Sequence, residues 1–248
     1  MSKSQEKEIF EYLSKKQFAE VHEIAQALSV STSTVRRKLT ALQERGLVIR
    51  KHGGAQIADV NEYFPSFTFR AHQNSLEKKK IALQAIKLIK NGDLIFLDGS
   101  TSAYYIAEYL SEFNDLRVVT NGIDTLSLLS KNGIMAYSTG GRISNANRSV
   151  LVGEKAIQDV LAYHADIAFF SASSVGQEGE VFDCFEEENV IRSYMLKNAT
   201  KKVLLCDSTK FGKSGQFRLC SLNDVDYLVT DEDKKGWFKT DKLPEIIF

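Results

Sequence analysis

The fold of the N-terminal part of this chain is decided by residues 31–55, which read STSTVRRKLTALQERGLVIRKHGGA. The stretch opens with hydroxyl side chains, which commonly cap the first turn of a helix. Apolar residues then recur at helical spacing, at Val35, Leu39 and Leu42. Gly46 ends the predicted helix, because glycine readily takes the left-handed conformation of a helix cap. Residues 47–52 follow as a short basic strand, and the two glycines after them predict a turn.

The charged residues of this helix lie between its apolar positions, so we expect them to point away from the buried face. A helix with a packed back, a cationic front and a basic strand beside it suits the major groove of DNA and its flanking backbone. An ordinary solvated helix would carry the same charges, so the interpretation depends on what precedes it. The residues predicted to contact double-stranded DNA are Ser31, Ser33, Thr34, Arg36, Arg37, Lys38, Arg50, Lys51 and His52.

A second short helix is predicted directly before this one, over residues 20–28. Its apolar residues fall on one side: Val21, Ile24, Ala25 and Leu28. Ser29 and Val30 leave room for no more than a tight turn. Two short helices joined by a turn, the second of them cationic, form a helix-turn-helix unit. Residues 4–16 add a first helix, and the basic strand makes the unit a winged one.

The composition is that of an ordinary globular protein, with 43% hydrophobic and 26% charged residues. The net charge of zero hides an asymmetry, because residues 1–57 carry ten Lys and Arg against six Asp and Glu, a net +4. The rest of the chain carries 22 basic and 26 acidic side chains, a net −4. A basic head on an acidic body fits a protein that offers one surface to a polyanion.

No apolar run approaches the roughly 20 residues needed to cross a bilayer, and the N-terminal sequence is polar. We therefore expect a cytoplasmic protein with no membrane partner. Cys184, Cys206 and Cys220 stand far apart, which argues against a disulfide framework and a cysteine-based zinc site. There is no Walker A and no G-x-G-x-x-G motif, so a nucleotide-dependent enzyme is disfavoured and no cofactor or metal is expected.

The texture of the sequence changes after residue 57. Residues 58–74 hold Asn61, Pro65 and aromatic residues without a sustained period: Tyr63, Phe64, Phe67 and Phe69. Flexible linkers are poor in aromatic residues, so we expect a linker whose aromatic side chains dock on a folded part. The predicted domains are 1–57, a winged helix-turn-helix; 58–74, a linker; and 75–248, an effector-binding and oligomerisation domain.

From residue 75 onwards, short apolar runs alternate with helical patterns. Continuous runs such as LIFL at 94–97 are typical of strands buried on both faces. Residues 173–185 are predicted to form an irregular loop. The predicted fold class is α/β, a small N-terminal winged helix-turn-helix domain followed by a larger α/β domain with a mostly parallel sheet.

Ligands of open parallel sheets bind beyond the carboxyl ends of the strands, so the loops at these ends are the candidate site. Four of them share small residues, hydroxyls and an occasional cation. Glycine lets backbone N–H groups approach an anion, hydroxyls donate further hydrogen bonds, and a helix start at Ser102 favours negative charge. Such tracts are often only turns and caps, but four at one edge indicate a phosphate pocket. The predicted effector-binding residues are Asp98, Gly99, Ser100, Thr101, Ser102, Thr120, Asn121, Gly140, Gly141, Arg142 and Lys210.

These motifs together closely resemble the DeoR family of bacterial transcriptional regulators. In the N-terminal block the resemblance rests on Val30-Ser31, residues 34–39, Leu42, Gly46 and residues 50–55. It continues through Glu77-Lys78, Ile81-Ala82, Gly92-Asp93, residues 96–98, Thr120-Asn121, Gly140-Gly141, Gly153 and residues 207–211, and so covers nearly the whole chain. Where the family often has Asp after its Arg-Arg pair, this chain has Lys38, which is expected to add a cation to the DNA-facing surface.

The resemblance implies a C-terminal domain similar to ribose-5-phosphate isomerase-like folds and repression of a sugar-catabolism operon, controlled by a phosphorylated sugar. A single copy of the DNA-binding motif reads one half-site, so we expect a homo-oligomer, at least a dimer. The alternative is a sugar-phosphate isomerase-like enzyme carrying a DNA-binding head. It would need a general acid or base, for which Asp98, Asp207 and Glu188 are candidates by position.

Overall fold

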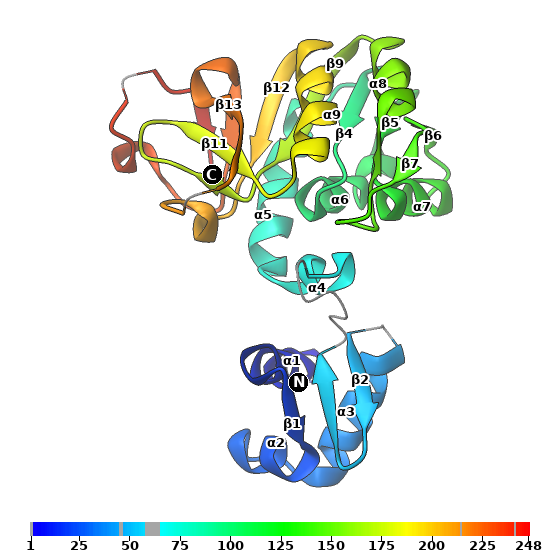
Figure 1. The fold of residues 1–248 in the computed structure, drawn as a ribbon, viewed down its shortest axis with the longest axis vertical. Coiled ribbons are helices and arrows are strands. Elements are labelled where there is room, and N and C mark those ends of the chain that lie inside the picture. The colour runs from blue at the N-terminus through cyan, green and yellow to red at the C-terminus, as the bar shows by residue number, and fades with distance from the viewer. Residues whose placement is uncertain (1, 45–46, 58–64, 214, 241) are drawn as a thin grey trace. The chain divides into compact units, whose positions relative to one another are not determined.

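A computed structural model describes residues 2–44, 47–57, 65–213, 215–240 and 242–248 (Figure 1). The chain forms two compact units, Met1–Gln73 and Asn74–Phe248, which are described separately. Within the described ranges, no helix combines the length and the apolar character needed to cross a membrane. The predictions for Gly46, Asn61, Tyr63 and Phe64 lie outside the described residues.

The first unit is a winged helix-turn-helix with an added helix. Its elements are α1 (Ser2–Lys16), β1 (Phe18–Glu20), α2 (Val21–Ala27), α3 (Thr32–Glu44), β2 (Val48–Lys51), β3 (Gly54–Ile57) and α4 (Phe67–His72). The strands form an antiparallel sheet in the order β1-β3-β2. The central strand β3 and the outer strand β1 were not expected from the sequence, because each is only three or four residues long and carries little periodicity.

The core of this unit is built from the apolar positions that the sequence pattern indicates. Val35, Leu39 and Leu42 of α3 are buried with Ile24 of α2 and Leu13 of α1, among other residues of one cluster. The predicted linker contains α4, which Ser66 caps by accepting a hydrogen bond from the Phe69 N–H. The Phe69 ring lies 5.4 Å from the Phe10 ring.

The second unit is an α/β domain around a parallel sheet of seven strands in the order β15-β14-β12-β9-β4-β5-β6. The strands of this sheet are β4 (Leu94–Leu97), β5 (Arg117–Thr120), β6 (Met135–Ser138), β9 (Ala165–Ser171), β12 (Ala199–Leu205), β14 (Tyr227–Val229) and β15 (Glu245–Ile247). The helices are α5 (Ser75–Ala85), α6 (Thr101–Ala107), α7 (Ile123–Lys131), α8 (Glu154–Leu161) and α9 (Glu186–Lys197). The predicted α/β fold class is confirmed.

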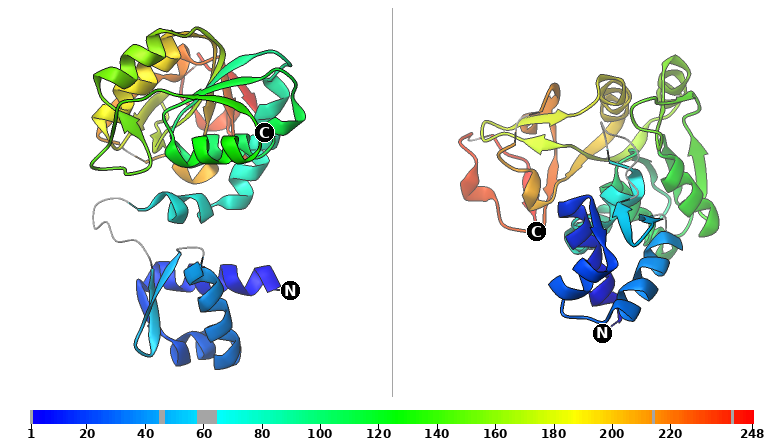
Figure 2. Two further views of the ribbon diagram at one scale, coloured as in Figure 1. Left: turned by 90° about the vertical axis from the view of Figure 1, so that its right-hand side faces the viewer. Right: turned by 60° about the horizontal axis from the view of Figure 1, so that its bottom comes forward.

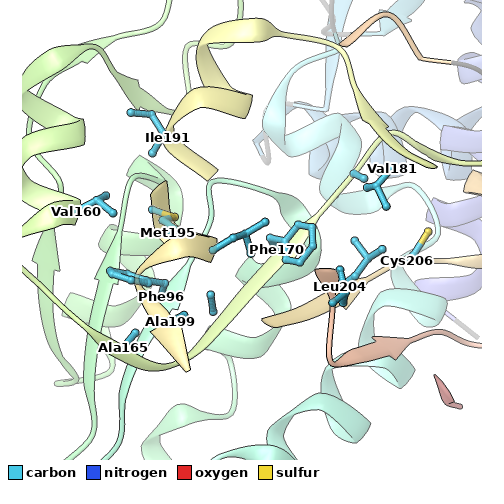
Figure 3. Packing of buried hydrophobic residues seen from close by; sticks show 14 of the residues in the cluster. Phe96, Val160, Ala165, Phe170, Val181, Ile191, Met195, Ala199, Leu204 and Cys206 are labelled. Carbon is cyan, nitrogen blue, oxygen red and sulfur yellow. The ribbon is translucent and has the colours of Figure 1, made fainter. Parts of the chain in front are cut away.

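Helices cover both faces of the sheet, with α5, α6 and α7 on one face and α8 and α9 on the other (Figures 1 and 2). Alternate residues of each strand therefore enter different cores: Ile95 and Leu97 pack with α5 and α6, whereas Phe96 packs with α8 and α9. This explains the uninterrupted apolar runs of the strands. Figure 3 shows part of the core between the sheet and helices α8 and α9, in which Phe170 belongs to the same cluster as Met195.

A small antiparallel sheet corrects the prediction of an irregular loop at 173–185. Within that segment lie β10 (Ser174–Val175) and β11 (Glu180–Asp183), which pair with each other and with β13 (Phe217–Ser221) in the order β10-β11-β13. A further short hairpin joins β7 (Arg142–Ile143) to β8 (Leu151–Val152). The small sheet begins directly after the parallel strand β9, and the hairpin begins directly after the parallel strand β6. Both therefore follow the carboxyl end of a parallel strand, and their residues help to enclose the edge of the sheet where these strands end.

Candidate DNA-binding surface and effector site

Helix α3 presents arginines from a capped first turn. The Ser31 hydroxyl accepts a hydrogen bond from the Thr34 N–H at 3.2 Å and lies 2.9 Å from the hydroxyls of both Ser33 and Thr34. The Arg36 and Arg37 side chains are exposed, while the apolar residues of the same helix are buried. The helix thus has the packed back and cationic front that its periodicity predicts.

Lys38 departs from this pattern and corrects the prediction that it faces DNA. Its residue is only 5% exposed, and its ammonium lies 2.9 Å from the Glu6 carboxylate of α1. A partly buried, hydrogen-bonded ion pair of this kind fixes two helices to each other. Lys38 therefore adds no free cation to the recognition surface.

The three basic residues of the wing differ in their surroundings: Arg50 contacts α3, whereas Lys51 and His52 are exposed. Arg50 is half-buried, and its Nη1 donates to the Arg36 carbonyl of α3 at 3.4 Å, so this side chain lies along the helix backbone. Lys51 and His52, at the tip of the β2–β3 hairpin, are exposed. Of the three predicted wing contacts, Lys51 and His52 are the ones that the fold presents to solvent.

In the second unit, Asp98 is fully buried and joins the loops of neighbouring strands. Its Oδ1 accepts from the Ser100 N–H at 3.1 Å, and its Oδ2 accepts from the Ser171 N–H at 3.2 Å, at the end of β9. The same Oδ2 lies 2.7 Å from Nε of Arg192 on α9. Both oxygens are thus engaged within the protein, so Asp98 holds the loops of the site together, and its predicted contact with an effector stays a prediction.

Arg192 is the centre of a buried charge network that the sequence reasoning missed. Besides Asp98, its guanidinium pairs with Asp183 of β11 and with Glu188, whose Oε2 lies 3.1 Å from Nη2. Burial opposes the charge of Arg192, but the three carboxylates raise its pKa above the ordinary value. Asn147 donates to the other oxygen of Glu188 at 3.0 Å. The i,i+4 spacing of Glu188 and Arg192 was the available signal, but this spacing is common on exposed helix faces.

Lys210 supplies a cation at the same edge of the sheet. Its ammonium donates to the Ser171 hydroxyl at 2.8 Å and lies 3.7 Å from Oδ2 of Asp207. The Ser171 hydroxyl donates to the Leu205 carbonyl at 2.6 Å and approaches the Ser102 hydroxyl to 3.4 Å. The fold thus brings Lys210 and Ser102 together, as the sequence predicted. They meet at Ser171, the last residue of β9.

One oxygen of Asp207 has no hydrogen-bond partner among the described residues, although it lies near the Lys210 ammonium. Burial opposes its ionisation, yet the Lys210 ammonium and the Thr209 hydroxyl hold its pKa below the usual range. Oδ1 accepts several hydrogen bonds, whereas Oδ2 is buried without a hydrogen-bond partner among the described residues. Buried polar atoms are nearly always paired, so Oδ2 is available to a donor.

The predicted hydroxyl donors after β4 and β5 are largely committed to the loops themselves. The Ser100 hydroxyl accepts from the Ala103 N–H at 3.2 Å, and the Thr120 hydroxyl accepts from the Gly122 N–H at 3.0 Å. Thr101 is buried. Asn121 is different, because its amide donates to the Leu151 carbonyl at 3.2 Å while its Oδ1 is buried without a partner among the described residues.

Close packing, rather than approach to an anion, accounts for the glycines. A Cβ on Gly99 would lie 2.2 Å from Cγ1 of Val150, and a Cβ on Gly141 would lie 2.6 Å from the Val152 carbonyl. Gly140 and Gly141 also adopt positive φ angles of 59° and 93°, which glycine tolerates best. These glycines let the segment around β8 cover the loop ends.

Arg142 and Lys210, the two predicted effector-binding cations, have different surroundings. Its side chain is exposed and pairs with Glu187 at the start of α9. The structure therefore gives Arg142 a surface ion pair and does not place it beside Lys210, so its predicted contact with a phosphate stays a prediction. Lys210 is the predicted effector cation that the fold places among buried hydroxyls.

A winged helix-turn-helix with exposed arginines, joined to a parallel α/β unit, defines a helix-turn-helix transcriptional regulator. Two family models match the chain: the DeoR-like helix-turn-helix domain over residues 6–61 and the DeoR C terminal sensor domain over residues 73–232. The chain belongs to the DeoR family.

Curated relatives cover most of the chain. It is 32% identical over 224 residues to the HTH-type transcriptional repressor GlcR of Bacillus subtilis, spanning 90% of this chain and 86% of that one. It is 34% identical to the HTH-type transcriptional regulator GolR of Listeria innocua, spanning 85% and 83%. The glycerol-3-phosphate regulon repressor of Escherichia coli is 26% identical, spanning 90% and 88%. Among solved structures, ribose 5-phosphate isomerase A of Methanocaldococcus jannaschii matches 56% of this chain and 55% of its own at 20% identity, with a TM-score of 0.43.

Proposed function

We propose that the protein is a sequence-specific repressor of a sugar-related operon, with α3 in the major groove of its operator. Arg36 and Arg37 are the exposed cations of this helix, and Thr34 lies two residues before Arg36. Lys51 and His52 hold the flanking backbone. The observation that supports this proposal best is the contrast within α3, where Lys38 is buried and paired while the two arginines remain exposed.

The test is operator binding by variants, after an operator has been selected from a random duplex library. Arg37→Ala should weaken binding by about 1–3 kcal/mol if it reads a base, and relax the sequence preference at one position. Lys131→Ala, which removes an exposed cation of the second unit, is the matched control and should bind as the wild type does. Equal affinity for Arg37→Ala and wild type would refute this role of α3.

We further propose that a phosphorylated sugar controls DNA binding from the edge where Lys210 lies. Lys210 offers the positive charge, and the hydroxyls of Ser102 and Ser171 lie beside it. Oδ2 of Asp207 and Oδ1 of Asn121, which have no hydrogen-bond partner among the described residues, are acceptors for the hydroxyl groups of a sugar. One relative is named for the glycerol-3-phosphate regulon, which supports an effector of this chemical class.

A thermal-shift screen of sugar phosphates and their unphosphorylated parents tests the effector. A ligand at a hundredfold excess over its dissociation constant stabilises the folded state by about 2.7 kcal/mol. We expect a shift with a phosphorylated sugar, none with its parent, and a strongly reduced shift in Lys210→Met. Arg142→Met should keep the shift, because Arg142 pairs with Glu187 at the surface. A shift unaffected by Lys210→Met would place the effector elsewhere.

We propose that the protein acts as a homo-oligomer in the cytoplasm and binds its effector without chemical turnover. One winged helix-turn-helix reads one half-site, so a dimer or higher oligomer is needed for a two-fold operator; sedimentation as a monomer with and without DNA would refute this. The carboxylates considered for acid–base catalysis are poorly suited to it, because Asp98 and Glu188 are paired with Arg192. Isomerisation of a sugar phosphate that Asp207→Asn abolishes would overturn the non-enzymatic assignment.

A further inference from the structure

The second unit begins at a residue with an unusual backbone and a specific set of contacts. Asn74 has φ 51° and ψ 40°, the left-handed conformation, and it immediately precedes α5. Asparagine is among the few residues other than glycine that adopt this conformation readily. Asn74 also follows Gln73, the last residue of the DNA-binding unit, in the chain. Asn74 is therefore the residue at which the second unit is covalently joined to the first.

The Asn74 amide is hydrogen-bonded to the loop that carries Lys210. Its Nδ2 donates to Oδ1 of Asp207 at 3.1 Å and to the Thr209 hydroxyl at 3.0 Å. The Thr209 hydroxyl in turn donates to the same Oδ1 at 2.5 Å. One carboxylate oxygen thus gathers the start of α5 and the loop after β12 into a single cluster.

The other oxygen of Asp207 faces the cation proposed to bind the effector. Oδ2 has no hydrogen-bond partner among the described residues, and the Lys210 ammonium is 3.7 Å away. This distance is longer than a hydrogen bond, so Lys210 balances the charge of Asp207 without being fixed by it. The two oxygens of one side chain therefore face the effector cation and the first residue of the second unit.

A second link ties α5 to the same loop. The Lys80 ammonium of α5 donates to the Asp231 carbonyl. The Asp231 carboxylate accepts from the Ser208 N–H at 2.6 Å and from the Ser208 hydroxyl at 2.9 Å. The loop at 207–210 is thus connected to α5 twice: directly at Asn74, before the first turn of the helix, and through Asp231 at Lys80, between one and two turns further along.

We propose that Asn74 and Asp207 form the link by which an effector at Lys210 acts on the start of α5, and through it on the chain segment that leads to the DNA-binding unit. The inference rests on the proposed effector site and adds its means of regulation. An anion drawn to Lys210 competes with Asp207 for the ammonium, while a sugar hydroxyl donates to Oδ2. Either event changes the charge that Asp207 presents to Asn74. A ligand shifts a conformational equilibrium only through such a difference in contacts between the two states.

Hydrogen–deuterium exchange of the full-length protein tests the link, with inorganic phosphate and a panel of sugar phosphates as probes. In the wild type we expect slower exchange both in residues 206–212 and in the amides of α5. Asn74→Gly keeps the left-handed conformation but removes the amide. In this variant the loop should respond as in the wild type, while the response of α5 falls by about fivefold or more.

Thr209 provides an independent pair of variants. Thr209→Val removes the hydroxyl that bridges Asn74 and Asp207 but leaves the direct bond between them, so it should weaken the response of α5 by less than Asn74→Gly does. Thr209→Ser keeps the hydroxyl and should retain it. Equal responses of α5 in the wild type, Asn74→Gly and Thr209→Val would overturn the link while leaving the effector site intact. If no probe slows exchange of residues 206–212 in the wild type, the effector site fails, and the link fails with it.

Discussion

Replacing Arg192 with methionine should destabilise the second unit by about 3–5 kcal/mol, the usual cost of removing one partner of a buried ion pair. The guanidinium pairs with Asp98, Asp183 and Glu188. Methionine has a similar length and fills much of the same volume, so the loss is mainly electrostatic. It leaves three carboxylates without their common counter-charge, and Asp98 is fully buried.

Urea unfolding followed by tryptophan fluorescence measures this loss. The protein has a single tryptophan, Trp237, which lies in the second unit and whose ring is 5.3 Å from that of Phe211. Arg142→Met is the matched control, because Arg142 forms an exposed ion pair with Glu187 and such pairs contribute about 0–1 kcal/mol. A loss below about 1 kcal/mol for Arg192→Met would refute the argument that the network depends on its central charge.

A double-mutant cycle separates charge from packing. Asp98→Asn removes the charge of the most deeply buried carboxylate while keeping its shape. If the cost of Arg192→Met arises from stranded charge, it should be smaller in the Asp98→Asn background by about 1 kcal/mol or more, within the range found for contacting residues. Additive losses would instead assign the effect to lost packing or to the other carboxylates.

Three further predictions follow from local geometry. Gly99→Ala should cost about 1–3 kcal/mol by overpacking, because its Cβ would meet Val150 at 2.2 Å; Val150→Ala in the same chain should relieve the loss, and Gly236→Ala, with open space around it, should be neutral. The lowered pKa of Asp207 means that its ionised form stabilises the folded state above the unfolded pKa of about 3.9. The deficit in unfolding free energy of Asp207→Asn should therefore be largest near neutral pH and shrink as the pH falls below about 4, and a deficit that grows in acid would contradict this sign. Burial raises the pKa of the Cys206 thiol to about 12, so iodoacetamide at pH 8 should label it only after unfolding, as peptide mass spectrometry would show.

The spacing of apolar residues was sufficient to predict the helices that face one core and the strands that lie between two cores. The apolar face of α3 and the continuous run of β4 are both of this kind, because a helix facing one core and a strand between two cores leave distinct patterns. Strand β11 left no such pattern. It contains Glu180 and Asp183, and it is stabilised by β13, which pairs Asp183 with Phe217 far along the chain.

The chemistry of the site was predictable by residue type but not by partner. Lys210 and Ser102 were placed correctly at one edge, because loops after parallel strands converge there. Lys38 is buried against Glu6, which lies 32 residues away in the sequence, and Asp98 pairs with Arg192, which lies 94 residues away. No local pattern distinguishes a solvated lysine from one that pairs with another helix. The sequence likewise could not show that Gly99 is required by Val150.

The buried edge of the sheet holds two cations, Arg192 and Lys210, which differ in how many groups bind them, and we expect the less firmly held cation to respond to the proposed effector. Arg192 is fixed through three nitrogens, with Nε 2.7 Å from Asp98 and Nη2 3.1 Å from Glu188. An anion would have to displace charge-assisted bonds there, which are the stronger kind. The Lys210 ammonium donates one hydrogen bond to the described residues, to the Ser171 hydroxyl, and lies 3.7 Å from Oδ2 of Asp207. An incoming phosphate therefore meets the smaller cost at Lys210. Asp207 also accepts a hydrogen bond from Asn74, so the end of the edge that is proposed to respond to an effector is the one that is hydrogen-bonded to the start of α5.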